Sequence, residues 1–317
     1  MDGPAHGVPV TLVQLEYALA VQKSGSIVGA AEACRVTQPT LTQQLQKLEE
    51  ELGGALFERG RHPLSPTALG RKVLDQAARV QAEAKRLRAL ALEDQGPPSG
   101  VYRLGVIPSV AGSLLPRATG TFLKRYPGVS LQVVERQSRD LVRDLFDGVL
   151  DAGIAALPLK ARGLASTELY REGFLAYFPE GHPLLGSACV EPKALGKERV
   201  LLMGEGHCFR HQALSLCKTQ PDGDGVHLES GSFHTLAALV DAGQGVTLLP
   251  EMEAKDLGTE RRLRLRPLSG GPAVRSVGMV HVRPAPKEKT ARALAAVIRE
   301  AVPTAKSGRV LSPGVEF

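Results

Sequence analysis

The residues with the clearest chemical potential lie in one short stretch, residues 205–217, which reads EGHCFRHQALSLC. Its apolar residues Phe209, Ala213 and Leu216 recur at the spacing of one helix face. Cys208 would then lie in the first turn of a helix, close to cationic side chains of the same stretch. A helix N-terminus and nearby positive charge both favour a thiolate, which is a nucleophile and a target of oxidation.

A second cysteine, Cys217, follows nine residues later. In a helix nine residues rise about 13–14 Å, whereas the Cα atoms of a disulfide lie within about 7 Å of each other. The two cysteines therefore cannot be bridged unless the helix unwinds, and such a pair has the properties of a redox switch. Four residues of this stretch have side chains of the types that bind metals: His207, Cys208, His211 and Cys217. We nevertheless expect no metal site, because His207 would point to another side of the helix and Cys217 would be too distant.

Length and composition limit the classes of protein that the chain can represent. Its 317 residues suffice for two or three compact units, and no apolar run approaches the roughly 18 residues of a membrane span. Because the chain shows no recognisable signal peptide, we expect a cytoplasmic location. Cys34 and Cys189 are expected to be small core residues. The net charge is +6, yet residues 1–95 hold 11 basic and 11 acidic residues, so a DNA-binding prediction must rest on a motif.

The first part of the chain predicts three helices. Apolar spacing indicates helices over 12–24 and 27–34, and a third that follows Thr37 and continues to Leu52. Thr37 is a good N-cap, and a proline is tolerated in the first turn. Two short helices, a tight turn and a polar-faced third helix form a helix-turn-helix, although composition alone would also fit an ordinary surface helix. The residues that we expect to contact DNA from this face are Thr37, Gln38, Pro39, Thr40, Thr42, Gln43 and Lys47.

The details of this region resemble a known family. Residues 30–49, AAEACRVTQPTLTQQLQKLE, are similar to the winged helix-turn-helix of LysR-type transcriptional regulators, as are ELGGALFER at 51–59 and LSPTALG at 64–70. The resemblance implies a wing between the last two segments. Arg59 and Arg61 would lie on that wing and touch the DNA backbone or the minor groove.

A long helix is expected next, because no helix breaker follows Gly70 until residue 94. Its apolar stripe suits a coiled-coil seam, and in the resembled family this linker helix pairs two subunits. A lone helix packed on its own body is the alternative. The stripe consists of Val73, Ala77, Val80, Ala84, Leu87 and Ala91. We therefore expect a DNA-binding domain over 10–68, a dimerisation helix over 67–95 and, after QGPPSG at 95–100, a regulatory domain over 100–305.

Beyond residue 100 strand-like and helix-like stretches alternate, which indicates α/β structure with a parallel sheet. The resemblance implies two Rossmann-like subdomains, as in periplasmic binding proteins, formed by 100–170 with 270–305 and by 171–269. We expect the tail from Pro303 to be loose. Predicted strands cover 101–107, 130–134, 152–156, 174–178, 200–203, 226–229, 246–249 and 274–282, and predicted helices cover 114–125, 139–146, 233–241 and 289–302.

The cysteine stretch narrows the resemblance to the peroxide-sensing branch of the LysR-type family, which IPSV at 107–110 and GVTLLP at 245–250 also match. This likeness implies that Cys208 is the peroxidatic thiol and Cys217 the resolving one. His211 stands where the family usually has an aspartate, which should change the protonation of the pocket. The residues implied to surround the thiolate and peroxide are His207, Arg210, Ser109, Ser138 and His227.

These observations predict a dimeric or tetrameric regulator that binds promoter DNA, senses hydrogen peroxide and acts on RNA polymerase. Thioredoxin- or glutaredoxin-type reductants would reset it, and no cofactor, metal or membrane is expected. The alternative is a LysR-type regulator whose small-molecule inducer binds between the subdomains, with incidental cysteines. A thiol peroxidase would have no use for a helix-turn-helix, so we do not expect an enzyme.

Overall fold

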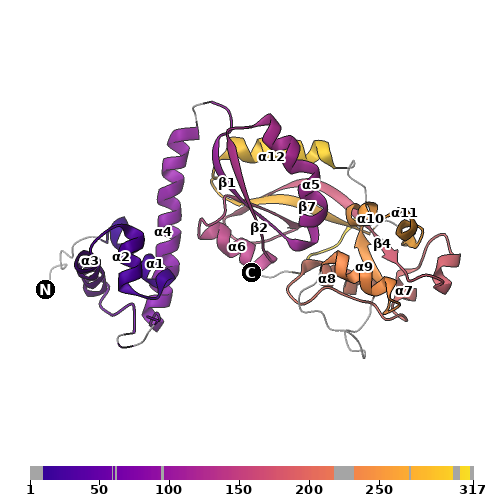
Figure 1. Ribbon diagram of the computed structural model, residues 1–317, viewed down its shortest axis with the longest axis horizontal. Helices are drawn as coiled ribbons and strands as arrows, with labels where there is room; N and C mark the ends of the chain where they lie inside the picture. The colour runs from indigo at the N-terminus through magenta and orange to yellow at the C-terminus, as the bar shows by residue number, and fades with distance from the viewer. Residues whose placement is uncertain are drawn as a thin grey trace. The chain divides into compact units, whose positions relative to one another are not determined.

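A computed structural model describes residues 10–58, 60, 63–93, 96–217, 232–270, 273–302 and 308–314 (Figure 1). The chain divides into two compact units, residues 1–92 with 146–149 and residues 93–145 with 150–317. Each unit is treated by itself below. The predicted DNA contacts Arg59 and Arg61, the predicted pocket residue His227 and the expected strand 226–229 lie outside the described residues.

The N-terminal unit contains the three short helices predicted from the sequence, α1 (Leu12–Ser24), α2 (Ile27–Cys34) and α3 (Gln38–Glu51). Each begins after a hydroxyl residue whose side chain accepts a backbone N–H bond, which satisfies one of the free donors of a helix end. The inner faces of the helices form one buried core. Its members include Ala18, Val21, Ala30, Leu41, Leu45, Leu48 and Leu56.

A tight turn and a short hairpin complete this unit. Arg35 ends α2 in the left-handed conformation, at φ 58°, and so reverses the chain ahead of α3. After α3 an antiparallel bridge joins Phe57 to Pro66, and the N–H of Glu58 donates to Ser65 O over 2.9 Å. The hairpin occupies the place predicted for the wing.

The long helix α4 (Ala68–Glu93) follows the hairpin. Its first turns belong to the core of the N-terminal unit, where Leu74 and Ala77 are buried. Further along the predicted stripe, Val80 is 37% exposed and Leu87 is 73% exposed. The stripe therefore packs on the helical core at Val73 and Ala77, whereas Val80 and Leu87 are exposed.

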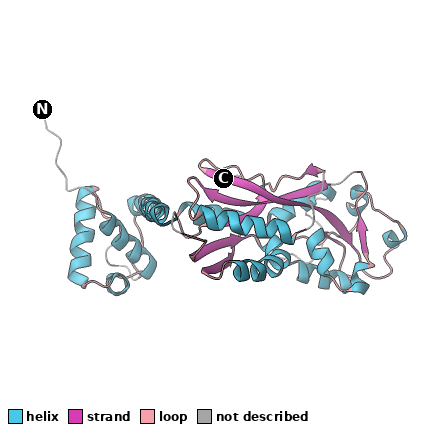
Figure 2. Ribbon diagram, turned by 90° about the horizontal axis from the view of Figure 1, so that it is seen from above, coloured by secondary structure: helices cyan, strands magenta, loops and turns pink. Residues whose placement is uncertain are grey.

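The C-terminal unit is built on a mixed sheet of eight strands among the described residues. Six of them follow the order β2-β1-β3-β7-β4-β5, while β6 pairs with β4 and β8 pairs with β7. Strands β1, β2 and β3 are parallel to one another, as predicted for that part of the chain, whereas β7 runs antiparallel to β3 and β4. The two longest strands are β4 and β7. Figure 2 draws the strands of this unit in magenta, with helices in cyan packed beside them. The strands are β1 (Gly100–Val106), β2 (Val129–Glu135), β3 (Ala152–Leu157), β4 (Leu164–Tyr177), β5 (Thr247–Pro250), β6 (Leu265–Pro267), β7 (Ala273–Val282) and β8 (Arg309–Val310).

Helices pack beside both ends of this sheet (Figure 1). Beside the β1–β2 end lie α5 (Pro108–Arg125), α6 (Ser138–Phe146) and α12 (Glu288–Ala301). Around the β4–β5 end lie α7 (Pro192–Leu195), α8 (Cys208–Cys217), α9 (Phe233–Asp241), α10 (Glu251–Asp256) and α11 (Thr259–Arg262), together with a 3-10 turn (Pro183–Gly186). No helix among the described residues is long and apolar enough to cross a membrane.

Several expectations for this unit were wrong or incomplete. Helix α5 begins six residues before the predicted Leu114, because Pro108 occupies its first turn, where a proline is tolerated. The expected strand 200–203 is reduced to a single bridge, from Val200 to Val246. Cys189 is exposed rather than in the core. The predicted strand 174–178 is only the end of β4, whose earlier residues 166–168 are polar and exposed.

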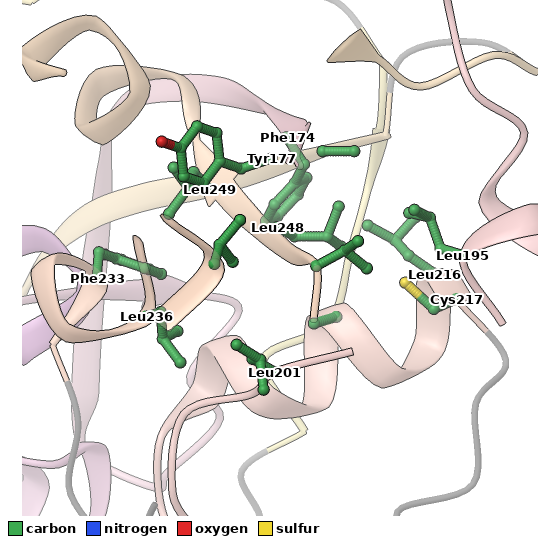
Figure 3. Close-up of a cluster of buried hydrophobic side chains, with 14 of the residues drawn as sticks. Phe174, Tyr177, Leu195, Leu201, Leu216, Cys217, Phe233, Leu236, Leu248 and Leu249 are labelled. Carbon is green, nitrogen blue, oxygen red and sulfur yellow. The ribbon is translucent and has the colours of Figure 1, made fainter. Parts of the chain in front are cut away.

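The tail is ordered where it is described, contrary to expectation. Strand β8 pairs in parallel with β7, and Leu311 is 4% exposed within the core of the β4–β5 end. The N–H of Leu311 donates to Val274 O over 2.9 Å. The same core holds aromatic and aliphatic side chains of β4, β5 and α9, with Leu216 and Cys217 at the end of α8 (Figure 3).

Candidate functional site

Cys208 is the first residue of α8 and is only 4% exposed. Its sulfur lies 4.0 Å from the hydroxyl of Ser109, and it also accepts hydrogen bonds from the Ser138 side chain and the Phe209 N–H. The structure thus brings together three of the residues predicted to form the thiol site, Cys208, Ser109 and Ser138, from three separate helices. Both serines are buried.

These three helices meet at their N-termini. Helix α5 begins at Pro108, α6 begins at Ser138 and α8 begins at Cys208 itself. The N-terminus of a helix carries a partial positive charge from its unpaired N–H groups. A sulfur at this place is therefore surrounded by the positive ends of helices, which suits an anionic thiolate.

A fully buried arginine adds a whole charge to the site. Arg275, on β7, is 0% exposed; its Nη1 donates to Ser109 Oγ over 3.1 Å and its Nη2 to Ser109 O over 2.8 Å. It forms an ion pair with Glu172 of β4, over 2.8 Å from Nη2 to Oε1. Sequence reasoning missed this residue. Its only signal in the sequence is an arginine inside the largely apolar predicted strand 274–282, which also contains Ser276 and His281.

Two opposing effects act on the pKa of Cys208. Burial raises the pKa of this thiol above its ordinary value, and it is the largest contribution. Arg275, the hydroxyls of Ser109 and Ser138 and the N–H of Phe209 each act to lower the same pKa. The expectation that a helix N-terminus and positive neighbours favour the thiolate did not include the burial of Cys208, which raises its pKa and so favours the thiol.

The other predicted neighbours of the thiolate are placed differently. His207 is 8% exposed, and burial lowers its pKa, so its imidazole is uncharged at neutral pH. Arg210 lies two residues after Cys208, in the first turn of α8, and donates to Met203 O over 3.4 Å. The buried cation that acts on the sulfur is Arg275 rather than either of these residues.

A polar pocket of about 560 Å³ opens beside Cys208. Gly206, on its wall, adopts φ 82°, and a Cβ there would lie 2.3 Å from Gln137 Oε1, so only glycine fits. Among the described residues, no three His, Cys, Asp or Glu side chains are grouped to hold a metal ion. The pocket is lined by Gln137, Arg139, Glu205, Gly206, His207, Cys208, Arg210, His211, Leu214, Pro313 and Gly314.

The C-terminal tail packs across the outer side of α8. Gln212 is 0% exposed, and its Nε2 donates to Leu311 O over 3.3 Å. The ring of His211 lies so close to Gly314 that a Cβ at 314 would be 2.2 Å from His211 Cγ. The position that departs from the resembled family therefore contacts the tail.

Cys217 lies at the other end of α8, 1% exposed in the core drawn in Figure 3 beside Leu195 and Leu216. Both thiols are free. The intact ten-residue helix α8 holds them about 13–14 Å apart, beyond the reach of a disulfide.

The predicted DNA-contacting face lies on α3 and its N-cap. Thr37, Gln38, Pro39, Thr40, Gln43 and Lys47 are exposed, and Thr42 is half-buried. The hydroxyls of Thr37 and Thr40 are 2.8 Å apart, which fixes the start of the helix. A polar helix face of this kind fits a major groove.

Comparison with known proteins identifies both parts of the chain. Residues 12–71 match the bacterial regulatory helix-turn-helix of the lysR family, and residues 95–303 match the LysR substrate binding domain. The chain belongs to the LysR family.

Several LysR-family relatives are similar over nearly the whole chain. A probable hydrogen peroxide-inducible genes activator of Mycobacterium leprae is 33% identical over 95% of this chain and 97% of its own length. The DNA-binding transcriptional dual regulator OxyR of Escherichia coli is 32% identical over 90% of this chain and 93% of its own.

Solved structures give the same result. Full-length OxyR of Pseudomonas aeruginosa, with a cysteine replaced by aspartate, is 30% identical and superimposes with a TM-score of 0.76, covering 93% of this chain and 99% of that one. A hydrogen peroxide-bound OxyR of Corynebacterium glutamicum, with a cysteine replaced by serine, is 28% identical with a TM-score of 0.61 and covers 93% of each chain.

The buried Cys217 gives this LysR-family protein a testable pH dependence. Burial raises the pKa of Cys217 from 9.0 to about 11. Because the pKa of Cys217 is higher in the folded protein, its burial stabilises folded α8 fully at pH values below 9.0, the pKa of the exposed thiol. This stabilisation is lost as the pH rises through about 11. In a Cys208→Ser background we therefore expect α8 to open across this window, measured by hydrogen exchange of its amides. The same opening in a Cys208→Ser/Cys217→Ala protein would contradict the assignment.

Proposed function

We propose that this chain is a DNA-binding transcriptional regulator that senses hydrogen peroxide through oxidation of Cys208. The observation that carries the proposal is the setting of the Cys208 sulfur, at the meeting point of three helix N-termini, with the buried Arg275 nearby and a pocket alongside. Relatives named as hydrogen peroxide-inducible activators support it.

The chemistry proceeds in two balanced steps. The thiolate of Cys208 attacks one oxygen of hydrogen peroxide, the O–O bond breaks, and the departing hydroxide takes up a proton to become water. Cys208 is then a sulfenic acid. The thiolate of Cys217 attacks its sulfur, an S–S bond forms, the S–O bond breaks, and the departing hydroxide leaves as water with the proton of Cys217. Two thiols and one peroxide thus yield a disulfide and two waters.

The second step requires α8 to unwind. When the residues of α8 leave the core, apolar side chains such as Leu216 and Phe209 become exposed. The free energy lost is about 1.5–3 kcal/mol for each of them. The disulfide holds the unwound backbone in place despite that cost. Unwinding of α8 would rearrange the core at the β4–β5 end of the sheet, and this rearrangement would transmit the oxidised state to the rest of the regulator.

The remaining parts of the chain provide the output. Within a DNA-binding domain over 10–68, α3 would read promoter DNA. The α4 helix, whose Val80 and Leu87 are exposed, would pair with a second copy in a homodimer or homotetramer. We further propose a cytoplasmic location, contact with RNA polymerase and resetting by thioredoxin- or glutaredoxin-type dithiols, which would reduce the disulfide and become oxidised themselves.

A non-reducing peptide map before and after peroxide treatment tests the proposal. We expect a Cys208–Cys217 disulfide and an altered DNA footprint in the wild type, and neither in a Cys208→Ser protein. Cys189→Ser is the matched control, because Cys189 is exposed and lies outside α8, the helix that carries both reacting cysteines. A Cys208→Ser protein whose footprint still changes with peroxide would refute the proposal.

A second candidate function is supported by the size of the pocket, about 560 Å³. This volume greatly exceeds that of a peroxide molecule, and Arg139 and Arg210 on its wall would suit an anionic inducer. Saturable binding of such a metabolite to Cys208→Ser protein, with a shifted DNA footprint under reducing conditions, would favour it.

A further inference from the structure

Glu172 is the buried partner of the arginine that faces Cys208. It lies on β4 and is 3% exposed, directly opposite Arg275 of β7 in the antiparallel ladder. One residue beyond its neighbour Gly173, β4 leaves β7 and pairs with β5 and β6 instead. We propose that Glu172 is a positioning residue for Cys208: it fixes the Arg275 guanidinium against Ser109 and takes up part of its positive charge, which limits the reactivity of Cys208 in the closed structure.

Both oxygens of the Glu172 carboxylate are held. Oε1 accepts the Nε–H of Arg275 over 2.9 Å, and Oε2 accepts the N–H of Met252 over 2.9 Å. A carboxylate anchored in this way leaves the guanidinium one orientation. The remaining N–H groups of Arg275 point at Ser109, whose hydroxyl lies 4.0 Å from the Cys208 sulfur.

The charge balance follows from this geometry. While Cys208 is a thiol, the buried pair of Arg275 and Glu172 is neutral, which is the state that a low-dielectric interior tolerates best. Deprotonation of Cys208 adds a second negative charge beside a single arginine. The negative charge of Glu172 therefore offsets part of the positive potential of Arg275 at the sulfur. This offset is large because the site is buried.

Other ionisable groups around the site do not replace Glu172. Tyr170 and Glu253 also interact with Arg275, and burial raises the pKa of each of them, so the Tyr170 hydroxyl is uncharged at neutral pH. Among the described residues, Glu172 is the carboxylate that forms an ion pair with the Arg275 guanidinium. The groups that line the pocket beside the sulfur are Arg139, Glu205, His207, Arg210 and His211.

The inference rests on the proposed function, since it concerns the reactivity that peroxide sensing requires, but its test does not use peroxide. The full chain carrying Cys34→Ser, Cys189→Ser and Cys217→Ser leaves Cys208 as its single thiol. Ultraviolet absorbance of the thiolate then gives the titration of Cys208 directly. Failure of peroxide sensing would leave this measurement interpretable.

In that background Glu172→Gln should move the titration of Cys208 to lower pH by about one unit, because Arg275 loses its competing anion. Glu168→Gln is the matched control: Glu168 also lies on β4, but its partners are Arg171 and Ser276. It should leave the titration unchanged. A purely structural role predicts the opposite shift, to higher pH, since a loosened Arg275 would stabilise the thiolate less. That result, or no shift, overturns the proposal.

A second comparison keeps the proposal testable if Glu172→Gln does not fold. The neutral pair Glu172→Gln/Arg275→Met removes both charges together, which buried ion pairs tolerate far better than the loss of one partner. Compared with Arg275→Met alone, the double variant should titrate at lower pH, because the potentials of the two charges add at the sulfur and the Glu172 anion opposes the thiolate whether or not Arg275 is present. Titration of the double variant at the same or a higher pH would show that the charge of Glu172 does not oppose the thiolate and would overturn the proposal.

Discussion

Replacing Arg275 by methionine should slow the reaction of Cys208 with hydrogen peroxide at neutral pH by about ten- to a hundredfold. Arg275 is the leading influence that lowers the pKa of Cys208 against its burial. Without it that pKa rises further, and the thiolate fraction falls by about tenfold for each unit. The measurement is the second-order rate constant of sulfenic acid formation across a range of pH. The rates of variant and wild type should converge at alkaline pH, where both thiols are ionised.

The same substitution leaves Glu172 buried without its partner, which should cost about 3–5 kcal/mol of stability. Stability and reactivity can be separated by Arg275→Lys, which keeps the charge but loses the planar fork that engages Ser109 and Glu172. It should retain most of the reactivity with reduced stability. If the Arg275→Met protein formed the sulfenic acid at the wild-type rate at neutral pH, the charge of Arg275 would not stabilise the Cys208 thiolate.

Gly70→Ala should disrupt the DNA-binding unit although alanine is the better helix former. A Cβ at 70 would lie 1.9 Å from the carbonyl oxygen of Leu56, far inside any real contact. That carbonyl cannot yield, because it accepts the N–H of Thr67 over 2.9 Å and belongs to a fully buried residue. Overpacking of this kind typically costs about 1–3 kcal/mol, and here the obstacle is backbone.

We therefore expect a lowered unfolding temperature of the N-terminal unit and a loss of DNA affinity, measured by calorimetry and fluorescence anisotropy. Gly120→Ala is the matched control. Gly120 also lies within a helix, α5, and a Cβ there would meet nothing within 4 Å, so this variant should be neutral or stabilising. If the Gly70→Ala protein had the unfolding temperature and DNA affinity of the wild type, the close approach of residue 70 to the Leu56 carbonyl would be excluded.

The helices of the N-terminal unit could be predicted to within two residues, because local signals determine them. Ser26 and Thr37 cap the helices that follow them, and the apolar spacing of α3 has the helical period. The start of α8 could be predicted for the same reason. Family resemblance then supplied Ser109 and Ser138 as neighbours of Cys208.

The electrostatics of the thiol site could not be predicted. The pairing of Arg275 with Glu172 depends on the register of two antiparallel strands that are about a hundred residues apart in sequence. No local pattern contains that register. The burial of Cys208, which reverses the expected direction of its pKa, likewise depends on how three helices meet.

The contact between α8 and the tail has a consequence for the evolution of the family. Glycine at 314 is required twice, by its φ of 64° and by the His211 ring that would collide with any Cβ. A relative with the smaller aspartate in place of His211 would be released from the second requirement and would accept asparagine at 314, which tolerates this backbone conformation. Positions 211 and 314 should therefore covary, so that a histidine on the sensing helix coincides with a glycine in the tail.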